Sequence, residues 1–121
     1  MLHRGHRMRD GEEFRRTMRR GTKAVTPTVV AHVAPGTDGV RSVGFVVSKA
    51  VGPAVVRNRV KRRLRHLMAQ RIERLPAGTR VVVRALPPAA TADSLADDLD
   101  ASLDRGLRRS ADRTATSVGR S

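Results

Sequence analysis

Residues 55–65, VVRNRVKRRLR, carry two patterns that a single structure must satisfy together. Six of the nine residues in 57–65 are Lys or Arg, and none is acidic. At ~100° per residue, the apolar side chains of this region share one side of a helix and most basic side chains share another. The apolar set is Val56, Val60, Leu64, Leu67 and Met68. We therefore expect a helix that buries one face in a core and presents a basic face to a polyanion.

The charge on this helix lacks the acidic partners that solvated helix faces usually carry at i,i+4. The first acid after the basic run is Glu73. Unpaired cations on adjacent turns repel one another, which favours a phosphate-backbone contact over an ordinary solvated face. Pro53 suits the first helical position and Gly52 the N-cap, so the positive helix N-terminus is expected beside Arg57 and Asn58.

The composition agrees with one domain that binds nucleic acid. The 121 residues carry a net charge of +14 and contain no cysteine, which excludes disulfides and thiolate metal sites. Residues 1–92 hold 20 basic and five acidic side chains (+15), whereas residues 93–121 hold five and six (−1). Neither an apolar run of ~18 residues nor a secretory apolar region is present, so we expect a cytoplasmic protein without a membrane partner.

The first half of the chain predicts a helix and two strands. Residues 1–9 look like a loose basic arm, and Asp10 with Glu13 forms a capping-box pattern for a helix that Gly21 ends. The segment 25–34 is short and β-branched, which predicts a strand. The turn at 35–39 leads to a second strand at 40–48, and an antiparallel hairpin is the simplest connection between the two.

The second half predicts the basic helix, which could extend to Arg74, then a strand and a last helix. A break at 76–78 precedes a strand at 79–86, and Thr91 or Asp93 can cap the last helix. Its apolar stripe is Leu95, Leu99, Leu103 and Leu107. Residues 109–121 lack apolar periodicity and predict a disordered tail. The fold class is α+β, a helix-strand-strand-helix-strand-helix sandwich at 10–108 with one mainly antiparallel sheet and the basic helix as a βαβ crossover.

No catalytic constellation is visible in the sequence. Walker, GxSxG, HExxH and zinc-finger patterns are absent, and the chain has two aromatic residues, Phe14 and Phe45. His3 and His6 have no further metal ligand nearby, and the aspartates 93, 97 and 98 suit a helix N-terminus. The pattern is typical of a binding protein that takes no small-molecule substrate.

The run at 44–65, GFVVSKAVGPAVVRNRVKRRLR, resembles the signature of the bacterial ribonuclease P protein subunit. In that signature a strand ending in Ser-Lys leads through a glycine-containing turn into a helix with Arg-Asn-Arg and then Lys-Arg. The order of elements around it also fits, and the resemblance spans about residues 7–108. It implies a left-handed βαβ crossover, an exception to the usual rule.

The resemblance also implies a function and a set of site residues. The family is a small basic subunit of an endoribonuclease whose catalytic RNA removes the 5′ leader of precursor tRNA with RNA-bound Mg²⁺. No catalytic or metal-binding residue is then expected on this chain. Residues expected to approach the catalytic RNA are Lys49, Arg57, Asn58, Arg59, Lys61, Arg62 and Arg65. The leader would lie in a cleft lined by Phe14, Met18 and His32.

Two positions depart from the family pattern, and three other functions compete. Met18 and His32 stand where members often carry aromatic residues, and Pro53 stands where Asn is common. A ribosomal-type protein that packs rRNA fits the charge equally well but leaves the signature unexplained. A protein-only nuclease would need clustered carboxylates or a histidine base in a basic cleft. A membrane-surface helix would need the apolar face that the core requires.

Overall fold

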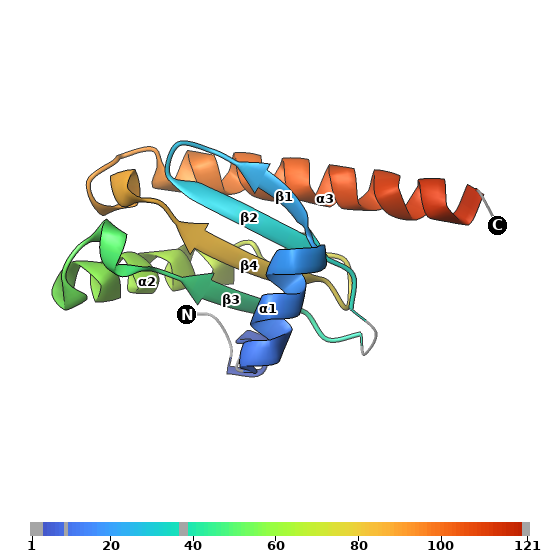
Figure 1. The fold of residues 1–121 in the computed structure, drawn as a ribbon, viewed down its shortest axis with the longest axis horizontal. Helices are drawn as coiled ribbons and strands as arrows, with labels where there is room; N and C mark the ends of the chain where they lie inside the picture. Colours follow the sequence, from blue (N-terminus) through green and yellow to red (C-terminus); the bar gives the residue numbers. More distant parts are fainter. Residues whose placement is uncertain (1–3, 9, 37–38, 120–121) are drawn as a thin grey trace.

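The computed structural model describes residues 4–8, 10–36 and 39–119, and it has the expected α+β architecture (Figure 1). One four-stranded sheet is accompanied by three α-helices and short 3-10 turns. The helices are α1 (Gly11–Arg20), α2 (Ala54–Ala69) and α3 (Leu95–Gly119). The strands are β1 (Thr22–Val25), β2 (Val29–Ala34), β3 (Ser42–Val46) and β4 (Arg80–Ala85). The 3-10 turns are η1 (Arg4–His6), η2 (Lys49–Val51), η3 (Ile72–Arg74) and η4 (Pro87–Ala90).

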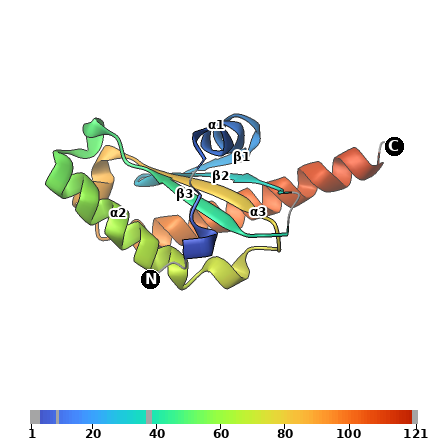
Figure 2. The ribbon, with the colours of Figure 1, turned by 90° about the horizontal axis from the view of Figure 1, so that it is seen from below.

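The helices cover the two faces of the sheet unequally. α2 and α3 lie on one face, and α1 crosses the other (Figure 2). The α2–α3 side contains the main core, because α2 contributes Val60, Leu64 and Met68 and α3 contributes its first three stripe leucines, all buried. Leu107 is partly buried against the same core. The periodicities read from the sequence therefore predicted the buried faces of both helices correctly.

The strand order is β1-β2-β4-β3. The antiparallel hairpin expected between residues 25–34 and 40–48 is therefore wrong, because β2 and β3 are not neighbours in the sheet. β4 lies between β2 and β3, antiparallel to the first and parallel to the second. Val81, Val82 and Val83 of β4 are fully buried. A strand that is apolar on both faces is most stable in the centre of a sheet, which explains the position of β4. The β3-α2-β4 unit passes behind the sheet with β4 above β3, which makes the crossover left-handed (Figures 1 and 2).

The real hairpin joins β1 to β2. The strand predicted for 25–34 is therefore confirmed over Val29–Ala34, but its first residue, Val25, belongs to β1. Thr22 pairs with Val33 and Val25 with Val30. The turn between the strands is closed by Thr26, whose hydroxyl donates to the Val29 carbonyl at 2.7 Å and whose backbone N–H donates to the same oxygen. The sequence did not predict β1, because the strand has only four residues and its alternation of apolar and polar side chains is weak.

α1 begins as predicted but is fixed to the sheet by different contacts. The Asp10 side chain accepts from the Glu12 backbone N–H at 3.0 Å. Glu13 does not complete a capping box; it forms an ion pair with Arg80 of β4 at 2.9 Å. Gly21 ends the helix with an extended backbone, and a Cβ there would lie 2.3 Å from the Thr17 carbonyl oxygen. The glycine is needed for close approach.

Both ends of the chain have more structure than the sequence indicated. In the expected basic arm, Met8 is buried and its N–H donates to the Val43 carbonyl at 2.8 Å, although residues 1–3 and 9 lie outside the described residues. The expected disordered tail is helical through Gly119, with residues 120–121 outside the description. Arg109 donates to the Lys23 carbonyl at 3.0 Å, a polar tether that apolar periodicity does not reveal.

The start of α3 is held by polar contacts. Its first turn follows Ser94, whose carbonyl accepts from Asp98 N–H, so neither Thr91 nor Asp93 is the cap. Asp98 accepts hydrogen bonds from Thr28 at 2.7 Å and from Ser94 at 3.1 Å. Asp98 therefore fastens the start of the helix to the residue that precedes β2.

Candidate RNA interface

The basic face of α2 is open and unpaired. Asn58, Arg59 and Arg62 are exposed, and Arg57, Lys61 and Arg65 are half-buried beside the apolar face. Within the described part of the chain, none of the five basic side chains in this set forms an ion pair with a carboxylate. The buried Nε of Arg57 has no hydrogen-bond partner in the same residues. The helix therefore presents a row of cations that have no counterion within the described part of the chain.

The N-terminus of α2 adds to this positive potential. Pro53 is the N-cap and not the first helical residue, since its carbonyl accepts from Arg57 N–H at 2.9 Å. No side chain caps the helix, which leaves its first N–H groups available to an anion. Exposed Lys49 lies in η2, the short turn just before this end. Gly52, with φ of 155°, makes the intervening turn, where a Cβ would meet Val56 at 3.0 Å.

α2 ends earlier than the sequence allowed, and an ion-pair cluster follows it. The helix stops at Ala69, and η3 continues the chain. Arg71 binds Asp100 of α3 through both carboxylate oxygens, at 2.5 and 3.1 Å, and Arg74 adds a contact of 2.8 Å. The Arg71 hydrogen bonds hold the pKa of the Asp100 carboxyl below its usual value. These two arginines share a carboxylate partner within the protein, unlike the arginines of the α2 face.

The three predicted leader residues meet between α1 and the sheet. Phe14 crosses β3 at Gly44, where a Cβ would lie 2.4 Å from the aromatic ring. Met18, one turn further along α1, has its backbone next to the His32 ring of β2. Phe14 and Met18 are half-buried, so part of each remains accessible along this edge of α1.

His32 is more enclosed than its two neighbours. It is 6% exposed, and both ring nitrogens lack a hydrogen-bond partner among the described residues. Burial, and then the charges of Arg84 and Lys23, lower the pKa of the imidazole. The Met18 backbone lies near the ring and acts in the opposite direction, raising the pKa. A neutral imidazole can donate one hydrogen bond and accept another, which suits an RNA base or sugar.

Arg84 is a residue of this surface that the sequence reasoning missed. The register places it opposite Val30 and Val46, on the sheet face that carries His32. It is half-buried, and its buried Nε has no partner in the described residues. Strand alternation in 79–86 could have revealed it, because Arg80, Val82 and Arg84 must share one face.

Two kinds of site find no support in the described residues. No group of three His, Asp or Glu side chains is arranged there to hold a metal ion. In the same residues, every helix is too short or too polar to cross a bilayer.

The fold and its surfaces define a small basic α+β protein whose unpaired helix face suits a polyanionic partner. Comparison with known proteins makes the class specific. The family described as Ribonuclease P matches residues 2–110, and the chain belongs to it. The Nocardioides "Ribonuclease P protein component" is 53% identical over 98 residues, covering 78% of this chain and 83% of the relative. The Beutenbergia cavernae protein of the same name is 57% identical over 95 residues, covering 78% and 80%.

Solved structures share the fold. The Staphylococcus aureus RNase P protein superimposes with a TM-score of 0.72 at 26% identity, covering 82% of this chain and 93% of that one. The Thermotoga maritima RNase P protein gives 0.70 at 21% identity, covering 84% and 96%, a likeness of fold alone. The family match ends at residue 110, whereas α3 continues to Gly119.

Proposed function

We propose that this chain is the protein subunit of the ribonuclease P holoenzyme of a bacterium. It binds the catalytic RNA and the 5′ leader of precursor tRNA, and it assists endonucleolytic removal of the leader. The observation that carries this proposal is the unpaired basic face of α2 in a chain of this family. Its place of action is the cytoplasm, where bacterial precursor tRNA is made.

The catalytic RNA is assigned to α2 and its N-terminal turn. The contacting residues are Lys49, Arg57, Asn58, Arg59, Lys61, Arg62 and Arg65. Arginine forks and lysine ammonium groups bind phosphate oxygens without reading base sequence, which suits the shape of a folded RNA. The apolar face of α2 is held in the core, so the helix is a rigid base for these side chains.

The leader is assigned to the α1 edge, over Phe14, Met18 and His32, with Arg84 added on the sheet. Phe14 is the aromatic side chain of this set and can stack on a base, a contact worth about 1–3 kcal/mol. Met18 and His32 supply a mixed apolar and polar floor. Arg84 supplies a positive charge beside this floor, and that charge favours a phosphate group of the bound leader.

The hydrolytic chemistry belongs to the RNA in this proposal. Mg²⁺ bound mainly by the RNA subunit would supply the Lewis-acid chemistry for hydrolysis, and no residue of this chain is assigned to hold it. The part assigned to this chain is to bind and orient RNA. Its net charge of +14 also replaces part of the cation atmosphere that brings two RNAs together.

Binding to the cognate catalytic RNA between 50 and 200 mM salt tests the α2 assignment. The Arg59→Ala/Arg62→Ala variant should bind more weakly, and its slope of log K against log[salt] should fall by about 0.7–0.9 for each phosphate that the variant no longer neutralises. The matched control is Arg105→Ala/Arg108→Ala on the outer side of α3, which removes the same charge. Equal slopes for the two variants would contradict the assignment.

A further inference from the structure

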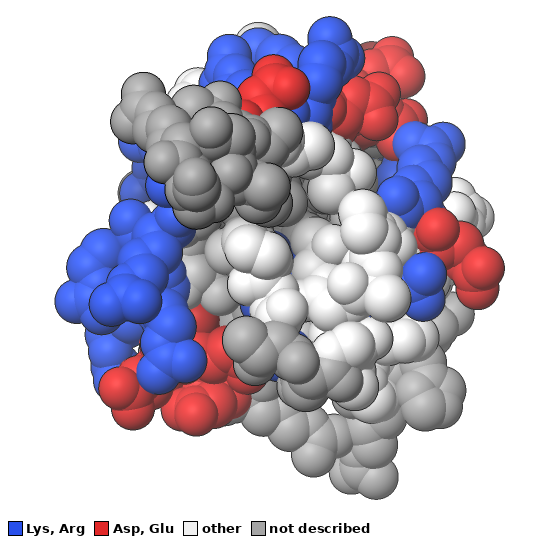
Figure 3. Space-filling model, turned by 90° about the vertical axis from the view of Figure 1, so that its right-hand side faces the viewer, with Lys and Arg blue, Asp and Glu red and all other residues white. Residues whose placement is uncertain are grey.

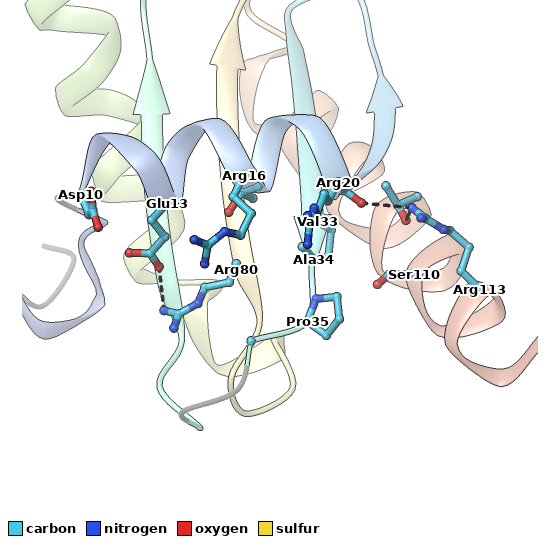
Figure 4. A pocket seen from close by; sticks show the side chains of 13 residues that line it. Asp10, Glu13, Arg16, Arg20, Val33, Ala34, Pro35, Arg80, Ser110 and Arg113 are labelled. Carbon is cyan, nitrogen blue, oxygen red and sulfur yellow. Dashed lines mark hydrogen bonds and ion pairs between the residues drawn. The ribbon is translucent and has the colours of Figure 1, made fainter. Parts of the chain in front are cut away.

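α1 divides its face of the sheet, and a second concave surface lies on the side away from Phe14 and Met18. A cavity of about 880 Å³ opens there between α1, the end of β2, the start of β4 and α3 (Figure 4). We call it the α1–α3 pocket and define it by Arg16, Arg20, Thr22, Arg80, Ser110 and Arg113. At ~100° per residue, Arg16 and Arg20 leave the edge of α1 opposite to Phe14 and Met18.

The pocket has a positive charge that the protein itself only partly neutralises. Its lining includes four arginines and two acids, Asp10 and Glu13, giving 4 − 2 = +2. Arg80 is paired with Glu13 at 2.9 Å. Arg16 approaches Glu12 only to 3.9 Å on an exposed surface, a contact of little energy. The Arg20 side chain makes no hydrogen bond or ion pair with the described part of the chain.

α3 closes the other side of the pocket with a positioned arginine. Arg113 donates to the Thr22 hydroxyl at 3.0 Å and reaches the Arg20 carbonyl at 3.4 Å (Figure 4). Both acceptors are neutral, so these contacts orient the guanidinium without cancelling its charge. Arg113 lies beyond residue 110, where the family match ends. The part of α3 that carries Arg113 therefore lies outside the residues that the family model matches.

The groups around the pocket identify the chemical class of its ligand. Guanidinium groups from two helices face one opening, and Thr22 and Ser110 contribute hydroxyls. Figure 4 shows Arg16 and Arg20 extending from α1 toward the opening, and Figure 3 faces this end of the molecule, with Lys and Arg gathered along its left edge. Arginine forks match the oxygens of phosphate in geometry and charge. An apolar ligand would leave the charge of the Arg20 guanidinium without a counterion among the described residues.

We propose that the α1–α3 pocket binds phosphate groups of an RNA backbone, as a second RNA site separate from α2 and from the leader cleft. The identity of the ligand as RNA rests on the proposed function. An RNA strand that lies along the Phe14 edge of α1 has to cross only this one helix, roughly 10–12 Å in diameter, to reach the pocket. The phosphates come either from upstream leader nucleotides or from the catalytic RNA.

The test uses the full-length Arg16→Ala/Arg20→Ala variant, because both side chains are exposed on α1 and do not support the core. One arm measures binding of the catalytic RNA to the protein. A second arm measures binding of precursor tRNA, with a long or a short leader, to the assembled holoenzyme. Arg105→Ala/Arg108→Ala is the charge-matched control in each arm, and Arg113→Ala tests the α3 wall independently.

The pocket variant should weaken binding more than the control and lower the salt slope by about 0.7–0.9 for each phosphate left without its arginine. Weaker binding in the first arm identifies the catalytic RNA as the ligand, and weaker binding confined to long leaders identifies the leader. Arg113→Ala should weaken binding in the same arm as the pocket variant. Equality with the control in both arms would overturn the pocket site. Arg59→Ala/Arg62→Ala, measured alongside, separates that failure from a failure of the proposed function.

Discussion

At the scale of single residues, the imidazole of His32 makes the stability of the fold depend on pH. The ring is buried under α1, close to the charges of Arg84 and Lys23. These neighbours and the burial lower its pKa in the folded protein, whereas the unfolded chain takes up the proton near the ordinary value of 6.5. Below that pH the unfolded state therefore binds more protons than the folded state, and acid favours unfolding.

We predict that the free energy of unfolding is at its full value above pH 6.5 and falls as the pH drops below it. One proton contributes a slope of at most about 1.4 kcal/mol per pH unit. Urea unfolding of the wild type and of His32→Leu between pH 5 and 8 measures the difference. The variant should lose this part of the pH dependence. Parallel profiles for the two proteins would mean that His32 remains equally protonated in both states.

Gly44 makes room for Phe14, which yields a second prediction at this scale. A methyl group on β3 would lie 2.4 Å from the ring, so the ring must move away from the sheet. Gly44→Ala should weaken binding of leader-bearing precursor to the holoenzyme and leave binding of the catalytic RNA unchanged. Gly11→Ala in the first turn of α1 is the control, because its Cβ would meet nothing closer than 3.5 Å. Unchanged leader affinity in a folded Gly44→Ala protein would remove Phe14 from the cleft assignment.

The sequence predicts residue roles best where a single element decides them. The faces of α2 follow from its own periodicity, and burial of Val60 and Leu64 confirms that prediction. Arg84 and the α1–α3 pocket depend on strand register and on the meeting of α1 with α3, which are long-range contacts. Glu13 shows the same limit, since the local capping pattern was overridden by Arg80, 67 positions away in the chain.

At the scale of elements, α2 carries its core contacts on one face and the basic side chains proposed to bind RNA on the other. Leu64 is fully buried, so Leu64→Ala should reduce the free energy of unfolding by about 2–5 kcal/mol. Arg59→Ala/Arg62→Ala should change it little, because both side chains are exposed and unpaired in the described structure. Chemical denaturation followed by circular dichroism measures both. The reverse order of effects would mean that the two faces are assigned wrongly.

The kind and order of most elements could be predicted, whereas their pairing could not. Helix periodicity and Gly or Pro breaks are local signals, and they located α1, the start of α2, β4 and the apolar stripe of α3. The insertion of β4 between β2 and β3 is a competition among strands for the sheet centre. The left-handed crossover was foreseen through family resemblance. The polar part of α3 was missed because its tethers, Arg109 and Arg113, bond to distant backbone and hydroxyl groups.

At the scale of the whole molecule, the basic charge is divided among surfaces with different orientations. α2 lies behind the sheet and α1 crosses its front (Figures 1 and 2). The edge of α1 proposed for the leader lies on one side of that helix, and the α1–α3 pocket lies on the other. A rigid core of strands and two helices connects them. Such an arrangement allows one small protein to contact a catalytic RNA and a substrate strand at the same time.

Cleavage of precursor tRNA by protein, by catalytic RNA and by both together is the most direct test of this account. The protein freed of RNA should not cleave at any Mg²⁺ concentration. With the RNA it should lower the Mg²⁺ requirement, because its cations replace part of the counterion screening, and it should favour precursors whose leader is long enough to reach the cleft. Site-specific cleavage by the protein alone, or equal stimulation with long and truncated leaders, would contradict it.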